Sequence, residues 1–145
     1  NAEINQEMRE IRLKMLKEMT AKDRIFADLI RLRLQMKAYI DHEPYEPTHT
    51  FGSYLREYLR IIDKTGKALS EDLDLHYSRF SRILNGKEDP NVEIAYRLEK
   101  HSGYLIPAVL WWKVLVKKQE HEIRENEEKR AQEARRVKNA FKFRA

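Results

Sequence analysis

Residues 69–87 read Leu-Ser-Glu-Asp-Leu-Asp-Leu-His-Tyr-Ser-Arg-Phe-Ser-Arg-Ile-Leu-Asn-Gly-Lys, and this stretch decides the fold. Apolar residues recur at helical spacing in residues 67–73 and again in residues 77–85, with the polar turn 74–76 between them. Gly86 stands where a left-handed residue commonly ends a helix. Two short helices joined by a tight turn, the second with a polar outer face, are typical of a helix-turn-helix.

The residues of the second short helix are suited to reading DNA. Arg79 and Arg82 are three positions apart and therefore share a helix face. An arginine can donate two hydrogen bonds to a guanine edge or hold a phosphate. Tyr77 and Ser78 lie in the first turn, the end that such a helix places in the major groove. These four side chains are therefore candidates for contact with base edges or phosphates.

Working outward from this stretch, the sequence divides into four parts. Residues 3–41 contain no Gly or Pro and predict a helical arm, with a possible second helix start at Thr20 and Asp23. Residues 42–50 contain Pro44 and Pro47 and predict an extended linker. Residues 51–116 predict five helices, at 51–62, 67–73, 77–85, 92–101 and from Pro107 to 116. Residues 117–145 predict a charged, exposed helix that frays. The fold class expected is all-α.

The arm carries an apolar stripe whose partner the sequence does not identify. Ile4, Met8, Ile11, Met15 and Met19 recur every three or four residues, and a wider apolar face follows from residue 25. A face of this width must pack against the rest of the chain, a second copy or another protein.

Composition excludes several classes of protein. The net charge is +5, but residues 1–50 and 51–103 each contain nine basic and nine acidic residues, so the excess comes from Lys113 and the tail. No cysteine is present, and the five histidines have no metal-ligand spacing. We expect no metal or other cofactor, and no catalysis, because no phosphate loop, nucleophile elbow or metal cluster is visible.

The longest apolar run is too short to span a bilayer, and no signal peptide is visible, so a cytoplasmic location is expected.

A resemblance to a known family adds to this interpretation. The segment Phe-Ser-Arg-Ile-Leu-Asn-Gly-Lys at 80–87 resembles the end of the recognition helix in lambda-repressor-like (XRE family) domains. The segment Phe-Gly-Ser-Tyr-Leu-Arg-Glu-Tyr-Leu at 51–59, and the helix at 91–103 followed by Pro107, resemble HigA-type antitoxins. The resemblance implies a five-helix DNA-binding domain over 51–116, dimeric, reading a palindromic operator. It places Tyr77, Ser78, Arg79 and Arg82 at bases, and Ser81, Asn85, Lys87 and Lys67 near phosphates.

The sequence also departs from the family pattern. Gly66 or Lys67 stands where the family usually has Gln, and Asp74 replaces the usual turn glycine, although Asp tolerates a left-handed conformation. Glu71, Asp72 and Asp74 place three acids close to the expected DNA face. Because the domain is neutral in sum, we expect weak non-specific binding unless the tail or dimerisation contributes.

The expected partners are operator DNA, a second copy of the chain and, by the family resemblance, a small ribonuclease toxin. One small domain can hardly bury both adjacent tryptophans, which favours a homodimer over a monomer whose arm covers the last helix. The expected interface consists of Trp111, Trp112 and Leu115. Two alternatives are an XRE-type repressor without a toxin, and a helical scaffold whose helix-turn-helix binds no DNA.

Overall fold

In a computed structural model of the protein, which describes residues 1–144, all regular structure is helical. The expected all-α class is confirmed, with seven helices and no strand in this range. Their bounds are α1 Ala2–His42, α2 Phe51–Ile62, α3 Gly66–Asp72, α4 Tyr77–Leu84, α5 Val92–His101, α6 Ala108–Glu125 and α7 Glu127–Arg136.

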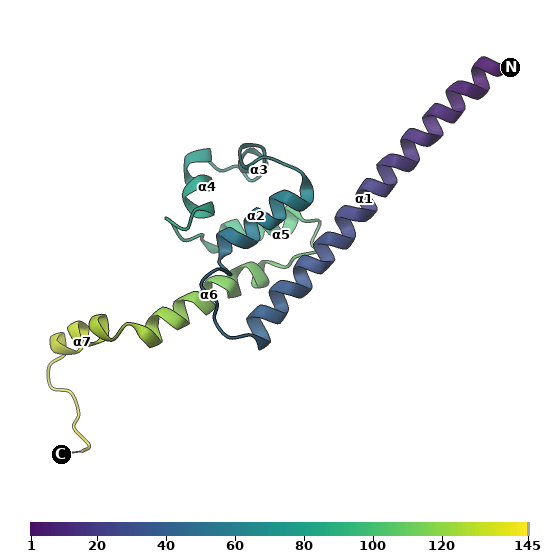
Figure 1. Ribbon diagram of the computed structural model, residues 1–145. Helices are drawn as coiled ribbons and strands as arrows, with labels where there is room; N and C mark the ends of the chain where they lie inside the picture. The colour runs from purple at the N-terminus through teal and green to yellow at the C-terminus, as the bar shows by residue number, and fades with distance from the viewer. Residues whose placement is uncertain (145) are drawn as a thin grey trace.

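α1 is one uninterrupted helix of 41 residues, so the expected second start at Thr20 is wrong. The hydroxyl of Thr20 donates a hydrogen bond to the carbonyl of Leu16 at 2.8 Å, and therefore does not cap a new helix. With no Gly or Pro in this stretch, nothing in the backbone interrupts the helix. Figure 1 shows α1 as a rod whose C-terminal half lies against the other helices while its N-terminal half projects beyond them.

The core lies where the C-terminal half of α1 meets α2 and α6. Four apolar residues of α1, spaced three or four apart, are buried there: Leu29, Leu32, Met36 and Tyr39. From the other side, Trp111 of α6 is fully buried, with its ring 5.5 Å from that of Phe51 and 5.8 Å from that of Tyr58. α5 packs against α6, and α4 packs against both α2 and α3.

The bounds of α2 to α5 agree with the expected helices to within one residue. Asn91 caps α5 through a hydrogen bond at 3.0 Å from the Ile94 amide, and Gly86 is left-handed with φ of 74°, as expected. The helix expected at 67–73 lies one residue earlier, because Thr65 caps it and Gly66 is its first residue. The left-handed residue that ends α2 is Asp63, with φ of 54°.

The charged tail also differs from the expectation. The helix that follows Pro107 ends at Glu125, and Asn126 caps the separate helix α7 through the Lys129 amide at 3.1 Å. Residues 137–144 are not helical, and α7 has no buried residue. No described helix is long and apolar enough to cross a membrane.

Candidate nucleic-acid interface

The α3–α4 unit is built on four buried side chains. Leu69 and Leu73 come from α3 and its end, and Phe80 and Ile83 come from α4. All four are no more than 3% exposed, so burial of their apolar surface fixes the arrangement of the two helices. The opposite face of α4 is left to the solvent.

The turn between the helices is held by backbone hydrogen bonds. Asp74 is left-handed with φ of 53°, as expected for the residue that replaces glycine. The amide of Leu75 donates to the carbonyl of Ser70 at 2.9 Å, the long-range bond of a Schellman motif. From α5, the guanidinium of Arg97 donates to the carbonyl of Leu73 at 3.1 Å. The turn is therefore fixed both locally and from a third helix.

The N-terminal turn of α4 is exposed and capped by a histidine. Tyr77 is 50% exposed, and Ser78 is exposed beside it. The ring Nδ1 of His76 accepts a hydrogen bond from the Ser78 amide at 3.2 Å and lies 2.7 Å from the Ser78 hydroxyl. His76 therefore has a defined structural role that its sequence position alone did not reveal.

Glu88 brings the two expected base-contacting arginines together. The Nε of Arg79 donates to one carboxylate oxygen of Glu88 at 2.8 Å, and the Nε of Arg82 donates to the other at 3.1 Å. Glu88 comes from the loop after α4, at a position that the sequence analysis did not select. Hydrogen bonds from Arg79 and then from Arg82 lower the pKa of Glu88, so the carboxylate is charged at neutral pH.

The Glu88 contact leaves the outer ends of the arginines available. Within residues 1–144, the terminal guanidinium nitrogens of Arg79 and Arg82 have no hydrogen-bond partner in the chain. Their side chains are 37% and 49% exposed. Each guanidinium is thus oriented by its inner nitrogen and presents two donors to the solvent.

The C-terminal end of α4 joins two more of the expected residues. The Nδ2 of Asn85 donates to the hydroxyl of Ser81 at 3.3 Å, while its Oδ1 accepts from Arg56 at 2.5 Å. Arg56 lies on α2 and adds an exposed cation beside the expected phosphate-contacting residues. Its proximity to Asn85 depends on how α2 crosses α4, which the sequence pattern does not specify.

The two expected lysines flank α4. Lys87 is exposed in the residue after Gly86, and its backbone amide donates to the carbonyl of Arg82 at 2.8 Å. Lys67 is exposed in the first turn of α3. That turn lies near the start of α4, because a Cβ on Gly66 would be 3.6 Å from the Tyr77 ring. The structure thus brings all eight expected residues to α4 or to the segments bordering it.

One of the three nearby acids is engaged elsewhere. The carboxylate of Asp72 accepts from Lys64 at 2.6 Å and lies 2.9 Å from Nε2 of His101 on α5. Because a carboxylate only accepts, His101 donates from Nε2, while its Nδ1 lies 2.6 Å from the Tyr58 hydroxyl. This chain of contacts directs Asp72 toward α5. Glu71 and Asp74 remain exposed.

The expected dimer-interface residues are mostly covered by the chain itself. Trp111 is 0% exposed and Leu115 is 3% exposed, while Trp112 is half-buried. α1 packs along α6, where the ammonium group of Lys117 lies 3.9 Å from the centroid of the Tyr39 ring. Of the three residues, Trp112 is thus the one that retains surface for another copy.

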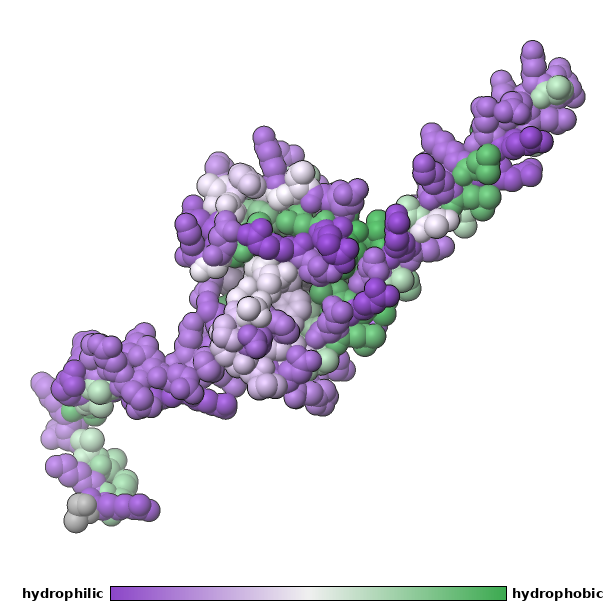
Figure 2. Space-filling view, viewed as in Figure 1, coloured by the Kyte–Doolittle hydropathy of each residue, from purple (hydrophilic) through white to green (hydrophobic). Residues whose placement is uncertain are grey.

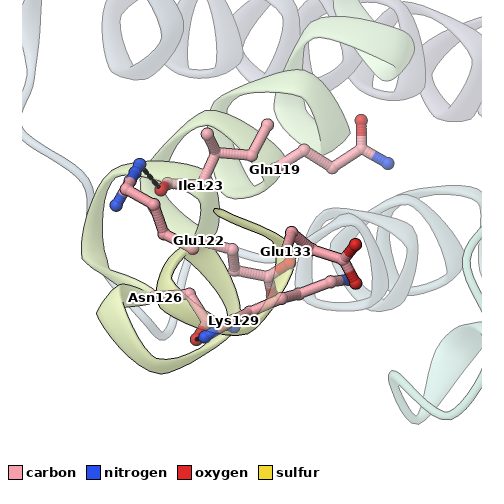
Figure 3. Close-up of a pocket in the computed structure, with 7 residues that line it drawn as sticks. Gln119, Glu122, Ile123, Asn126, Lys129 and Glu133 are labelled. Atoms are coloured by element: carbon pink, nitrogen blue, oxygen red, sulfur yellow. Dashed lines mark hydrogen bonds between the residues drawn. The ribbon is translucent and has the colours of Figure 1, made fainter. Parts of the chain in front are cut away.

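A separate hollow lies between α6 and α7, where the chain changes direction (Figure 3). Ile123 lies at its edge, and the guanidinium of Arg130 donates to the Ile123 carbonyl. Both signs of charge line it, from Glu122, Glu133 and Lys129. No group of three or more potential metal ligands occurs among residues 1–144.

Comparison with family models, with characterised proteins and with solved structures found no match for this chain. What the comparisons and the structure together establish is an all-helical protein of seven helices in its described part.

Proposed function

We propose that the protein is a sequence-specific DNA-binding regulator that inserts α4 into the major groove. The observation that carries the proposal is the exposed side of α4, where Arg79 and Arg82 are oriented by Glu88 with their outer nitrogens facing the solvent. Two oriented donors per arginine suit the O6 and N7 acceptors of guanine. Tyr77 and Ser78 extend the same surface toward the N-terminus of α4.

Basic side chains lie near both ends of α4, where they could contact the DNA phosphates on either side of the groove. Arg56 and Lys87 lie at the C-terminal end of α4, and Lys67 lies near its N-terminal end. Cations in these places would neutralise phosphates and fix the helix in the groove, while the arginines select bases. Because Asp72 is held against α5, fewer acids oppose DNA than the sequence count indicates.

Arginine variants test this assignment. Arg82→Ala and Arg79→Ala should each weaken binding to the cognate operator by about tenfold to a hundredfold, the usual value of a bidentate base contact. Arg124→Ala on α6, an arginine paired with Glu120, is the matched control and should bind as the wild type does. The measurement is fluorescence anisotropy with operator DNA selected from a random library. Unchanged affinity in both α4 variants would contradict the recognition-helix assignment.

Glu88→Gln extends the same experiment. It removes a negative charge beside the DNA and weakens the orientation of both arginines. Affinity for unrelated DNA should therefore rise, and the ratio of specific to non-specific affinity should fall. An unchanged ratio would mean that Glu88 does not position the arginines for recognition.

We further propose that the regulator is a dimeric lambda-repressor-like protein, most like a HigA-type antitoxin that represses its own operon and binds a small ribonuclease toxin. This part rests on the sequence resemblance of residues 51–116. Two copies of α4 would enter successive major grooves about 34 Å apart. A neighbouring reading frame for a small basic protein that co-purifies with this chain would support it.

Two other functions make different predictions. An XRE-type repressor without a toxin would bind its upstream DNA and have no such neighbouring gene. A helical scaffold would shift no DNA from its own upstream region, while still binding a protein partner through the exposed helices. The exposed acids Glu71 and Asp74 are the observation that favours the scaffold.

A further inference from the structure

The N-terminal half of α1 has an apolar stripe that no other part of the described chain covers. Its members are between 54% and 60% exposed: Ile4, Met8, Ile11, Met15 and Met19. The same helix buries Leu29, Leu32 and Met36 at the same three- and four-residue spacing where it meets the core. The stripe thus has the same spacing as the packed face of α1 but lies beyond the domain. Figure 2 shows apolar residues among polar ones along this projecting arm.

The arm cannot cover its own stripe. α1 is one continuous helix, and it leads away from the other helices instead of folding back on them (Figure 1). Covering the stripe therefore requires another molecule.

The charges on the arm identify that molecule. Residues 3–10 contain the acids Glu3, Glu7 and Glu10 and a single base, Arg9. Residues 11–17 contain the bases Arg12, Lys14 and Lys17 and no acid. Two such arms side by side in the same direction would place like charges together, whereas opposite directions place each acidic segment against a basic one.

We propose that the arm is an antiparallel dimerisation helix whose partner is the arm of a second copy of this chain. The stripe spacing fits this arrangement. The positions 4, 8, 11 and 15 are separated by four, three and four residues, so the spacing is the same from either end. In an antiparallel pair, Ile4 therefore meets the partner's Met15, Met8 meets the partner's Ile11, and the two-fold symmetry repeats both contacts to give four apolar layers. Glu7 and Lys14 flank the stripe on the same side of the helix, so each Glu7 then lies near the partner's Lys14.

This contact depends on the pattern of α1 alone and needs no DNA. In the pairing above, the two copies of Ile25, where each arm meets its domain, lie about 46 Å apart along the helix axis.

Sedimentation velocity on the full chain over a concentration series tests the apolar part of the proposal. The wild type should associate, and Ile11→Glu should shift its association to at least about tenfold higher concentration. Leu13→Glu is the matched control, because Leu13 is 60% exposed but lies two residues from both Ile11 and Met15, on the other side of the helix. Association that Ile11→Glu leaves unchanged, or that Leu13→Glu weakens equally, would overturn the proposal.

Charge exchange tests the direction of the arms. Glu7→Lys should weaken association, because it places a lysine beside the partner's Lys14. The exchange Glu7→Lys/Lys14→Glu should restore association, because opposite charges then face each other again. In a parallel dimer Lys14 does not lie beside the partner's Glu7, so the exchange would not restore association, and that result would overturn the antiparallel arrangement. Circular dichroism on every variant confirms that α1 remains helical.

Discussion

Glu88 illustrates how a residue outside the helices can determine what a helix presents. Its carboxylate joins Arg79 and Arg82 through their Nε atoms, so the two guanidinium groups have fixed orientations before any ligand binds. Preorganised donors lose less conformational freedom on binding than mobile ones. In the proposed function, the same carboxylate would repel phosphates, so it would lower the affinity for unrelated DNA and favour the cognate site.

Asp72 predicts how stability depends on pH. Hydrogen bonds from Lys64 and then from His101 lower its pKa below the usual value, so ionised Asp72 stabilises the folded chain at neutral pH. This stabilisation is complete above the ordinary pKa of an aspartate and is lost as the pH falls through the lowered pKa. Asp72→Asn should therefore reduce the free energy of unfolding at pH 7 and have a smaller effect near pH 3. Urea unfolding at both pH values measures the difference, and a gap that stays constant contradicts the assignment.

At the scale of helices, Gly52 sets the distance between α2 and α4. A Cβ at this position would lie 2.2 Å from the carbonyl oxygen of Leu84, which is backbone and cannot move without shifting α4. Gly52→Ala should therefore destabilise the protein by about 1–3 kcal/mol. Gly66→Ala is the comparison, because its Cβ would meet a ring atom of Phe80 at 3.1 Å and alanine favours a helix by about 0.5–1 kcal/mol. Thermal unfolding should separate the two variants, and equal melting temperatures would contradict the close approach.

Several helix boundaries could be predicted from the sequence because they depend on local chemistry. Asn91 and Gly86 lie where their side chain or backbone satisfies a helix end, and this needs no tertiary information. The continuity of α1 through Thr20 could not be settled in the same way, because threonine can either cap a helix or bond back to the preceding turn. The end of α2 at Ile62 was predicted, but the left-handed residue that follows it, Asp63, was not, because aspartate adopts this conformation less readily than glycine.

The candidate site shows the same limit on prediction. The eight expected residues were selected from one helix and its borders, where spacing along the chain determines the face, and their contact with DNA stays a prediction. Arg56 and Glu88 were not identified, because their contacts depend on how α2 crosses α4 and on the path of the loop after Gly86. Trp111 and Leu115 were expected at an interface between copies, yet α1 and the other helices bury them within one chain.

At the scale of the whole molecule, the positive charge lies far from the middle of the chain. Residues 129–145 contain seven basic residues and one acid, while residues 51–103 are neutral in sum. α7 has no buried residue, and Phe141 and Phe143 are 87% and 90% exposed beyond it. Figure 1 places α7 and the described C-terminal residues at the opposite end of the molecule from the projecting half of α1. The tail and the arm are thus independent extensions of one helical core.

The position of the tail leads to a prediction about salt. If the regulator binds DNA through α4, the tail can add phosphate contacts that carry no sequence information, and each contact steepens the slope of log K against log salt by about 0.9. Removing residues 129–145 should weaken binding to cognate and unrelated DNA by the same factor and flatten that slope. Lys138→Gln/Lys142→Gln/Arg144→Gln keeps the chain length and should produce part of the same change. Because no buried residue is removed, the melting temperature should stay constant. A slope identical to that of the full chain would mean that the tail does not contact phosphate, and the +5 charge would then contribute nothing to DNA binding.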